Sequence, residues 1–249
     1  MDNNLYDGPD RIGEKTLATI SNADAFNKWM YDTIKRYTSG HVLEIGSGIG
    51  NISRYFLADG MKITLSDLRD NYCKVLEEKF NSFPNLGGIL KLDLTHPDFE
   101  TAYSGLLGSF DSIFALNVVE HIEDHKLAIA NCNKLLKTGG NIIILVPAYQ
   151  WLYNGFDKGL GHYRRYTKQR LTNLIAGNDF EVIHSQYFNF FAIAGWFISG
   201  SILHKETIPE GQMKFFNRLV PVFKILDKII FNKAGISTIC VGRKIKIAD

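Results

Sequence analysis

The sequence is poor in cysteine and has no paired cysteine motif. Its three cysteines, Cys73, Cys132 and Cys240, lie far apart in the 249-residue chain, and none belongs to a C-x-x-C pair. A disulfide framework and a structural zinc site are therefore disfavoured. Because this usage of cysteine fits a reducing compartment, we expect a cytoplasmic protein.

We expect neither an export signal nor a membrane-spanning segment. Residues 1–15 are polar and acidic, whereas a signal peptide begins with basic residues and continues with apolar ones. Residues 187–203 form an uncharged run of 17, just short of the length typical of a span, and Asn189 and Gly195 weaken a span further. We expect this run to be a strand that continues into a buried helix, and we expect this helix to cover the pocket of the molecule on which the protein acts.

Neither sign of charge dominates, because the formal net charge is +2. No long basic stripe is present, and no N-P-P-Y-type amide clamp follows the fourth expected strand, so we expect no nucleic-acid partner. With 45% hydrophobic residues, the chain is large enough for one sizeable domain and too short for two full ones.

The most informative segment is V-L-E-I-G-S-G-I-G-N-I-S-R-Y-F-L, residues 42–57. Its apolar start predicts a buried strand and its end predicts a helix, with a glycine turn between them. Glycines there bring the backbone close to a ligand, which the N–H groups of the helix also face. A dinucleotide fingerprint would have its third glycine where Asn51 stands, so a pyrophosphate ligand is disfavoured. Glu44 instead suits an α-ammonium group or ribose hydroxyls.

Strand and helix patterns alternate from Gly40 onward, which indicates parallel βαβ units. Strands are expected at 41–45, 61–66, 88–92, 111–117, 141–147, 180–188 and 236–244. Helices are expected at 23–37, capped by Ser21 or Asn22, and at 50–58, 70–80, 124–136 and 167–176. The predicted fold is α/β, with a doubly wound, mostly parallel seven-stranded sheet. We expect a helical cap over 1–39 and the main domain over 40–249, with an acceptor-binding insertion at 149–170 and a helical segment at 189–233.

Polar side chains follow the expected strands at the carboxyl edge of the sheet, where ligands bind in such folds. Asp67 lies 23 residues after Glu44, the place of an acidic residue that holds ribose hydroxyls. Asp93 can accept from an adenine amine while Leu94 packs against the ring, although a capped turn would also explain Asp93. Asn117 ends the fourth strand.

Several motifs together resemble the class I S-adenosylmethionine-dependent methyltransferases. E-x-G-x-G-x-G resembles their motif I, and F-D-S-I-F-A-L-N-V-V-E-H-I and L-L-K-T-G-G-N-I-I-I-L-V-P follow in the expected order, so the resemblance covers residues 40–147. It implies a Rossmann-like methyltransferase fold, S-adenosyl-L-methionine as cofactor and S-adenosyl-L-homocysteine as product. It places these residues at the cofactor: Glu44, Gly46, Ser47, Gly48, Gly50, Asn51, Asp67, Leu68, Asp93, Leu94, Asn117 and Val118.

The segment after Asn117 resembles that of ubiquinone-pathway O-methyltransferases, in which two glutamates three residues apart and an adjacent histidine bind a divalent metal. Asn117 stands at the first glutamate position, so one anionic ligand is missing and we expect no metal site. His121 is either a histidine with a backbone partner in the core or a catalytic base.

Residues 149–171 are the expected acceptor wall, because they follow the fifth strand beside the cofactor's methyl group. Aromatic and basic side chains there are expected to bind the acceptor: Tyr149, Trp151, Tyr153, Tyr163 and Arg164. His162 and Arg165, with His121, are the catalytic candidates, although the two arginines could simply neutralise the next helix. The element G-H-x-R-R-Y is similar to one in bacterial methyltransferases of natural-product or glycolipid pathways.

These patterns predict an enzyme that transfers a methyl group to an oxygen of a small acidic or phenolic acceptor, or to a carboxyl group of a modified peptide. One alternative is a methyltransferase of a lipid or glycolipid intermediate that touches the membrane peripherally through residues 187–233. Residues 213–233 are basic and amphipathic, although a core-facing helix with a solvated face would explain them too, with a break or a helix start at Pro221. Another alternative is a module that binds the cofactor without catalysis. The oligomeric state stays open.

Overall fold

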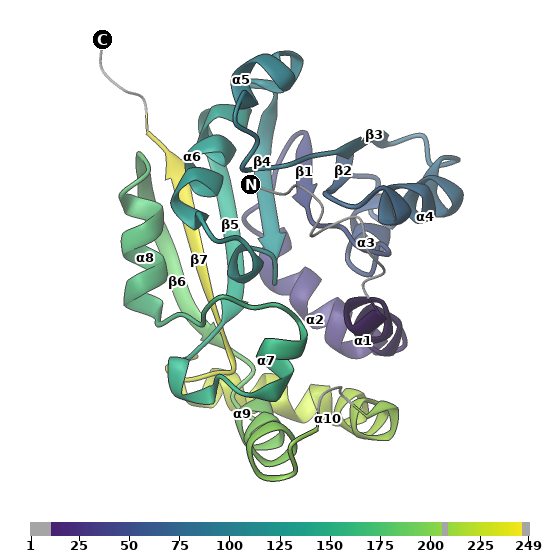
Figure 1. The fold of residues 1–249 in the computed structure, drawn as a ribbon, viewed down its shortest axis with the longest axis vertical. Coiled ribbons are helices and arrows are strands. Elements are labelled where there is room, and N and C mark those ends of the chain that lie inside the picture. The colour runs from purple at the N-terminus through teal and green to yellow at the C-terminus, as the bar shows by residue number, and fades with distance from the viewer. Residues whose placement is uncertain (1–10, 206–208, 246–249) are drawn as a thin grey trace.

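The computed structural model describes residues 11–205 and 209–245, and its centre is a seven-stranded sheet (Figure 1). The strands are β1 (Val42–Ile45), β2 (Ile63–Asp67), β3 (Leu86–Lys91), β4 (Phe110–Leu116), β5 (Leu136–Pro147), β6 (Phe180–Phe188) and β7 (Ser237–Lys244). Their order is β3-β2-β1-β4-β5-β7-β6. In this sheet β7 alone runs opposite to the other six strands, which confirms the predicted mostly parallel sheet of seven strands.

Helical segments connect the strands and cover the sheet (Figure 1). In chain order they are α1 (Arg11–Ser21), α2 (Asp24–Lys35), α3 (Ser53–Ala58), α4 (Asp70–Phe80), α5 (Phe99–Ala102), η2 (Ser104–Leu106), η3 (Val119–His121), α6 (His125–Leu135), η4 (Gln150–Leu152), α7 (Gly155–Gly159), α8 (Lys168–Ala176), α9 (Ala192–Trp196), η5 (Phe197–Ile202) and α10 (Glu210–Ile229).

The core has one layer on each face of the sheet, because the central strands are buried on both sides. Neighbouring residues of a strand point to opposite faces. On β1, Leu43 packs in the layer that contains Ala128 of α6, and Val42 packs in the layer that contains Ile34 of α2 and Val220 of α10. The sheet is thereby held rigidly and its carboxyl edge is fixed in place.

The cap of the second helix was predicted wrongly. The residue before α2 is Ala23, which makes no side-chain cap. The Ser21 hydroxyl and the Asn22 side-chain amide instead donate to the carbonyl of Ala18, at 2.7 and 3.3 Å. These two side chains do not cap α2 because a further helix, α1, ends directly before it. A carbonyl in the last turn of α1 accepts their hydrogen bonds instead.

Two other predictions in the second half of the chain were wrong. The helix break expected at Pro221 does not occur, because α10 runs through it and is held by Val220 and Phe223 in the core. The helix expected to be buried after β6 forms α9 and η5. Of these residues Ser199 and Gly200 are buried, whereas Phe197 and Ile202 are exposed.

Candidate active site

The glycine turn after β1 has the backbone geometry that the motif predicts. Gly46, Gly48 and Gly50 have φ angles of 67°, 54° and 82°, which favour glycine. A Cβ atom on Gly46 would lie 2.5 Å from a methyl group of Val118, and one on Gly48 would lie 3.0 Å from a methyl group of Leu17. The turn is therefore enclosed between α1 and the segment that follows β4.

Asp67 lies at the end of β2 and faces this turn. Its Oδ2 accepts a hydrogen bond from the backbone N–H of Gly48 at 2.9 Å, and its Oδ1 accepts from the N–H of Arg69 at 3.0 Å. Burial raises the pKa of Asp67 above its usual value, while these N–H groups favour the charged form. Because a carboxylate oxygen can accept more than one hydrogen bond, the group still suits ribose hydroxyls.

Glu44 is directed at the residues of the turn itself. Its carboxyl group is only 4% exposed and accepts hydrogen bonds from the hydroxyls of Ser53 and Ser47. Burial raises the pKa of Glu44 to about 8. The side chain thus braces the turn against the first residue of α3, and its direct contact with a cofactor stays a prediction.

The remaining cofactor candidates lie along the same edge. Oδ1 of Asp93 accepts from the N–H and the hydroxyl of Thr95, both at 2.7 Å, so the expected alternative of a capped turn is realised there. Leu94 is buried, Leu68 and Val118 are half-buried, and Asn117 is exposed with a φ of 54°. The Asn51 amide donates to the carbonyl of Leu17 at 3.1 Å.

This edge fits an adenosyl cofactor. The strand order places the ends of β3, β2, β1 and β4 side by side, so their carboxylates and Asn117 follow one another along the edge. The glycines leave room for close approach, and the buried acceptor Asp67 is positioned by the turn itself.

A second polar group lies beyond β4 and β5 and is built around Asp157. Its Oδ1 accepts from Nδ1 of His162 and from Nε of Arg165, both at 2.8 Å. Arg165 also donates to the carbonyl of Ala148 at 3.0 Å and is 1% exposed. The sequence predicted that Arg165 contacts the acceptor. In the structure its guanidinium group is buried and donates hydrogen bonds to Asp157 and to the carbonyl of Ala148.

Glu120, His121 and His162 form the other side of this group. Nε2 of His162 lies 4.0 Å from Oε1 of Glu120, and the two imidazole rings are perpendicular with centroids 4.6 Å apart. The ring of His121 donates to the carbonyl of Leu160, and burial lowers its pKa to about 3. Burial raises the pKa of Glu120 to about 8, and both of its oxygens lack a hydrogen-bond partner in the described part of the chain.

These three residues each offer one ligand atom, and the three atoms lie within 4.8 Å of one another. In the part of the chain that the structure describes, this group of residues could hold a metal ion, and it contains His162 and not Asn117. The expectation of no metal stays a prediction. Without an ion, Glu120 is a neutral acid at pH 7 beside His162, whose Nδ1 is oriented by Asp157.

The predicted acceptor residues have different surroundings in the structure. Tyr149 stacks between Trp151 and Tyr187, with ring centroids 5.9 and 5.0 Å away. The hydroxyl of Tyr153 donates to the carbonyl of His162 at 2.7 Å and so supports the segment that carries this histidine.

Arg164 and Tyr163 lie further out on the same segment. Arg164 donates to the carbonyl of Glu123 at 2.9 Å and lies 5.4 Å from the ring centroid of Tyr163, which is exposed. Backbone bonds from Tyr163 to Glu120 and from Tyr149 to Tyr166 fix the segment beside η3 and β5.

Sequence reasoning missed Asp157, Glu120 and Tyr187 as members of the site. The segment N-G-F-D forms a capping box in which the Asn154 side chain accepts from the backbone of α7 and Asp157 accepts from the N–H of Asn154. This N-x-x-D pattern, five residues before a histidine, was the available signal. Glu120 stands three residues after Asn117, at the second glutamate position of the metal-binding segment from which no metal site is expected.

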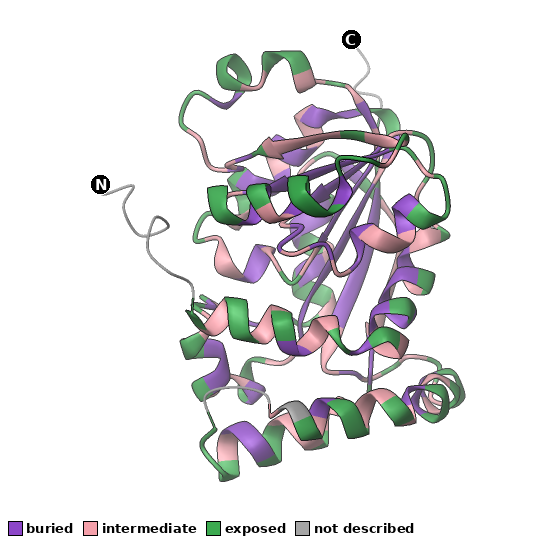
Figure 2. Cartoon of the chain, turned by 90° about the vertical axis from the view of Figure 1, so that its right-hand side faces the viewer, coloured by how far each residue is buried: buried purple, intermediate pink, exposed green. Residues whose placement is uncertain are grey.

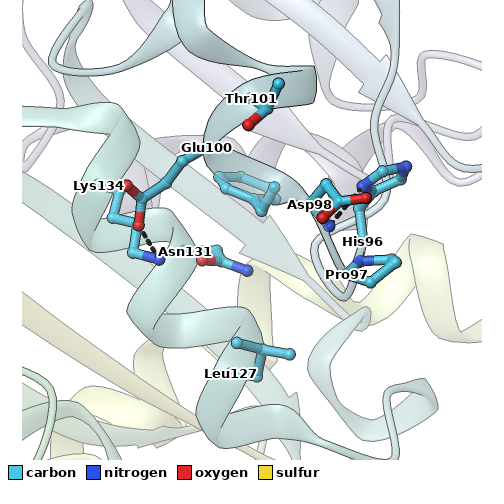
Figure 3. Close-up of a pocket in the computed structure, with 9 residues that line it drawn as sticks. His96, Pro97, Asp98, Glu100, Thr101, Leu127, Asn131 and Lys134 are labelled. Atoms are coloured by element: carbon cyan, nitrogen blue, oxygen red, sulfur yellow. Dashed lines mark hydrogen bonds and ion pairs between the residues drawn. The ribbon is translucent and has the colours of Figure 1, made fainter.

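A separate hollow of about 270 Å³ lies between α5 and α6 (Figure 3). Glu100 and Lys134 form an ion pair of 2.8 Å across it, and Nδ1 of His96 accepts from the N–H of Asp98 at 3.1 Å (Figure 3). None of the residues that line it belongs to the predicted set, so it is distinct from the carboxyl-edge site.

Comparison with known proteins shows similarity to methyltransferases in sequence and in fold. Residues 43–142 match the model of a methyltransferase domain. The chain is 26% identical over 166 residues to lovastatin nonaketide synthase mokA of Monascus pilosus, covering 54% of this chain and 5% of that protein. It is 24% identical over 139 residues to a ubiquinone biosynthesis O-methyltransferase of Xanthomonas oryzae pv. oryzae, covering 51% of this chain and 56% of that protein.

A crystal structure of a SAM-dependent methyltransferase from Archaeoglobus fulgidus has the same fold. It is 16% identical, has a TM-score of 0.58, and the match covers 88% of this chain and 94% of that one. Among the curated relatives, the match spans 5% of the synthase and 56% of the ubiquinone biosynthesis O-methyltransferase, less than two thirds of either protein.

Proposed function

We propose that the chain is a class I S-adenosylmethionine-dependent methyltransferase and that it transfers a methyl group from S-adenosylmethionine to the oxygen of a small hydroxyl-bearing acceptor, such as a phenol. The observation that carries the proposal is the histidine–aspartate pair of His162 and Asp157 beside the carboxyl edge of the sheet. A hydroxyl must lose its proton as the methyl group arrives, and such a pair can take it.

The residues of this chain would hold the cofactor through Asp67, on its ribose, and through the backbone of the Gly46–Gly50 turn. When bound, the cofactor supplies a methyl group on a positively charged sulfur, which an oxygen attacks in line. The protein then has to align the acceptor and exclude water, and alignment alone can supply several kcal/mol of the barrier.

His162 is suited to hold the acceptor's proton at its Nε2. Asp157 accepts from Nδ1 and so fixes the ring and its tautomer, while Arg165 holds Asp157 in place. Arg165 is therefore a positioning residue in this proposal. His121 packs against His162 and donates to Leu160, which supports a role in orienting that ring.

A strongly acidic acceptor is less well supported than a phenol or an alcohol. Arg165 is occupied inside the fold, and Arg164 is bonded to Glu123. An arginine clamp for a carboxylate would need one of these guanidinium groups to leave its partners. The stacked rings of Tyr149, Trp151 and Tyr187 offer a flat apolar wall that suits an aromatic acceptor.

The test is methyl transfer from isotopically labelled S-adenosylmethionine, with a host extract as the source of acceptor and mass spectrometry as the readout. We expect one labelled product class with the methyl group on oxygen. His162→Gln should lower the rate of methyl transfer at least tenfold and leave cofactor affinity unchanged. His96→Gln, in the separate hollow, is the matched control and should behave like the unchanged protein.

Two outcomes would contradict the proposal. Cofactor binding without any labelled product would support a module that binds and does not catalyse. Full activity of the His162→Gln variant, with the label on a carboxyl group, would show that the acceptor needs no base.

A further inference from the structure

Helix α10 has apolar side chains on both of its faces. Met213, Val220 and Phe223 are buried against the core. On the outward side, Phe215, Val222, Ile225 and Ile229 follow one another at spacings of seven, three and four residues, and each is more than half exposed. A surface helix of a soluble protein normally turns polar residues outward. The outward apolar stripe is therefore not explained by packing against residues 11–205 and 209–245.

The same end of the molecule carries further exposed apolar residues. α9 and η5 lie beside α10 along the lower edge of the molecule in both views (Figures 1 and 2). Phe197, Ile198, Ile202 and Leu203 are 41–56% exposed there. We call the outward stripe of α10 and these four residues the docking face. An apolar surface of this extent marks an interaction site.

The exposed charged side chains that the structure describes on the outward side of α10 are basic. Lys214, Arg218 and Lys228 lie on the outward side of α10 between its apolar residues, and none has an ion pair within residues 11–205 and 209–245. Lys224 instead turns toward Asp32 of α2. Asp227 is buried and accepts hydrogen bonds from the backbone N–H groups of Asn189 and Phe190, so its carboxylate does not lie on this surface.

The docking face adjoins the proposed acceptor wall. Trp151 is 63% exposed and contacts Phe197 edge-on, with centroids 6.3 Å apart, while its other neighbour is Tyr149. A hollow of about 360 Å³ lies among Trp151, Phe190, Phe191 and Phe197. Aromatic side chains at such a rim suit the boundary between headgroups and acyl chains.

We propose that the docking face binds an anionic lipid membrane, with the apolar side chains entering the interface and the cations meeting lipid phosphates. No helix in the described part of the chain is both long and apolar enough to cross a membrane, so the contact is with one surface. Apolar residues combined with lysine and arginine are what such interfacial helices share. A protein partner with an acidic rim or a second copy of this chain is an outcome of the test.

The test is flotation of the full chain with vesicles of phosphatidylcholine alone or mixed with phosphatidylglycerol. We expect binding to the mixed vesicles that weakens with salt, and little binding to neutral ones. The double variant Ile225→Glu, Ile229→Glu should bind at least tenfold more weakly. Lys214→Glu with Lys228→Glu should also lose about tenfold, with a weaker salt dependence.

The matched control is Leu127→Glu with Ile245→Glu, two exposed apolar residues outside the docking face. It should float like the unchanged protein. The proposal is overturned if the chain does not float with anionic vesicles, or if the control variant loses binding as much as the docking-face variant. It is also overturned if light scattering shows that the unchanged protein is a dimer and that the Ile225→Glu, Ile229→Glu variant is a monomer. Flotation does not depend on methyl transfer, so a protein that does not float can still have the proposed function. A protein that floats but transfers no methyl group would contradict the proposed function and still support the docking face.

Discussion

Glu120 gives the sharpest test of the buried polar group, because its stability effect has a definite sign. Burial raises its pKa from 4.5 to about 8. Between these values the folded state holds a proton that the unfolded state has lost, so the free energy of unfolding falls as the pH rises. The loss is about 1.4 kcal/mol for each pH unit in this window.

The histidines define which part of the window is informative. Burial lowers the pKa of His121 from 6.5 to about 3 and that of His125 to about 4. These rings stay neutral in the folded state, so they make stability rise with pH up to about 6.5 and contribute nothing above it. Burial also raises the pKa of Glu44 to about 8, so Glu44 lowers the free energy of unfolding over the same pH range as Glu120.

The perturbation is Glu120→Gln, which keeps the shape and removes the titration. From pH 6.5 to pH 8, Glu120 should account for a loss of roughly 2 kcal/mol in the free energy of unfolding, as an upper bound. The variant should therefore lose less stability over this interval than the unchanged protein by up to that amount. Comparing slopes removes any cost of the amide that is independent of pH.

The assay is urea unfolding at a series of pH values, in a chelator-containing buffer so that no metal ion holds the carboxylate. Glu44→Gln should give a similar change in slope, whereas Glu100→Gln, on the surface, should give none. Parallel curves for the Glu120→Gln variant and the unchanged protein would show that Glu120 is ionised in the folded state, and the neutral-acid interpretation would be wrong.

Three further predictions concern the cofactor edge and the aspartate of the second group. Asp67→Ala should weaken binding of S-adenosylhomocysteine more than tenfold by calorimetry, whereas Asp70→Ala, on the surface, should not; equal affinities would remove Asp67 from the ribose. Gly46→Val should abolish cofactor binding because its side chain meets Val118, and retained affinity would show that the turn can open. Arg165→Met should cost about 3 kcal/mol in urea unfolding by leaving Asp157 partly unpaired, and a loss below about 1 kcal/mol would refute its positioning role.

Much of the first half of the chain follows from its sequence. The glycine turn requires positive φ, parallel strands require apolar runs, and both requirements are visible in residues 42–57. The position of Asp67 at the end of the second strand, near the glycine turn, then follows from the rules of doubly wound sheets.

The second half was less predictable because its outcome depends on tertiary contacts. Pro221 favours a helix break locally, but Val220 and Phe223 in the core hold α10 together. The role of Arg165 depends on Asp157, which lies eight residues earlier and comes close only through the turn after α7. The apolar outward face of α10 could not be told from its buried face by periodicity alone.

A crystal structure of the chain with S-adenosylhomocysteine would test the central claim most directly. We predict density for the nucleoside at the carboxyl edge, with ribose hydroxyls on Asp67 and the amino-acid part against the Gly46–Gly50 turn. Density elsewhere, or none at this edge when the compound saturates the protein in solution, would contradict the account.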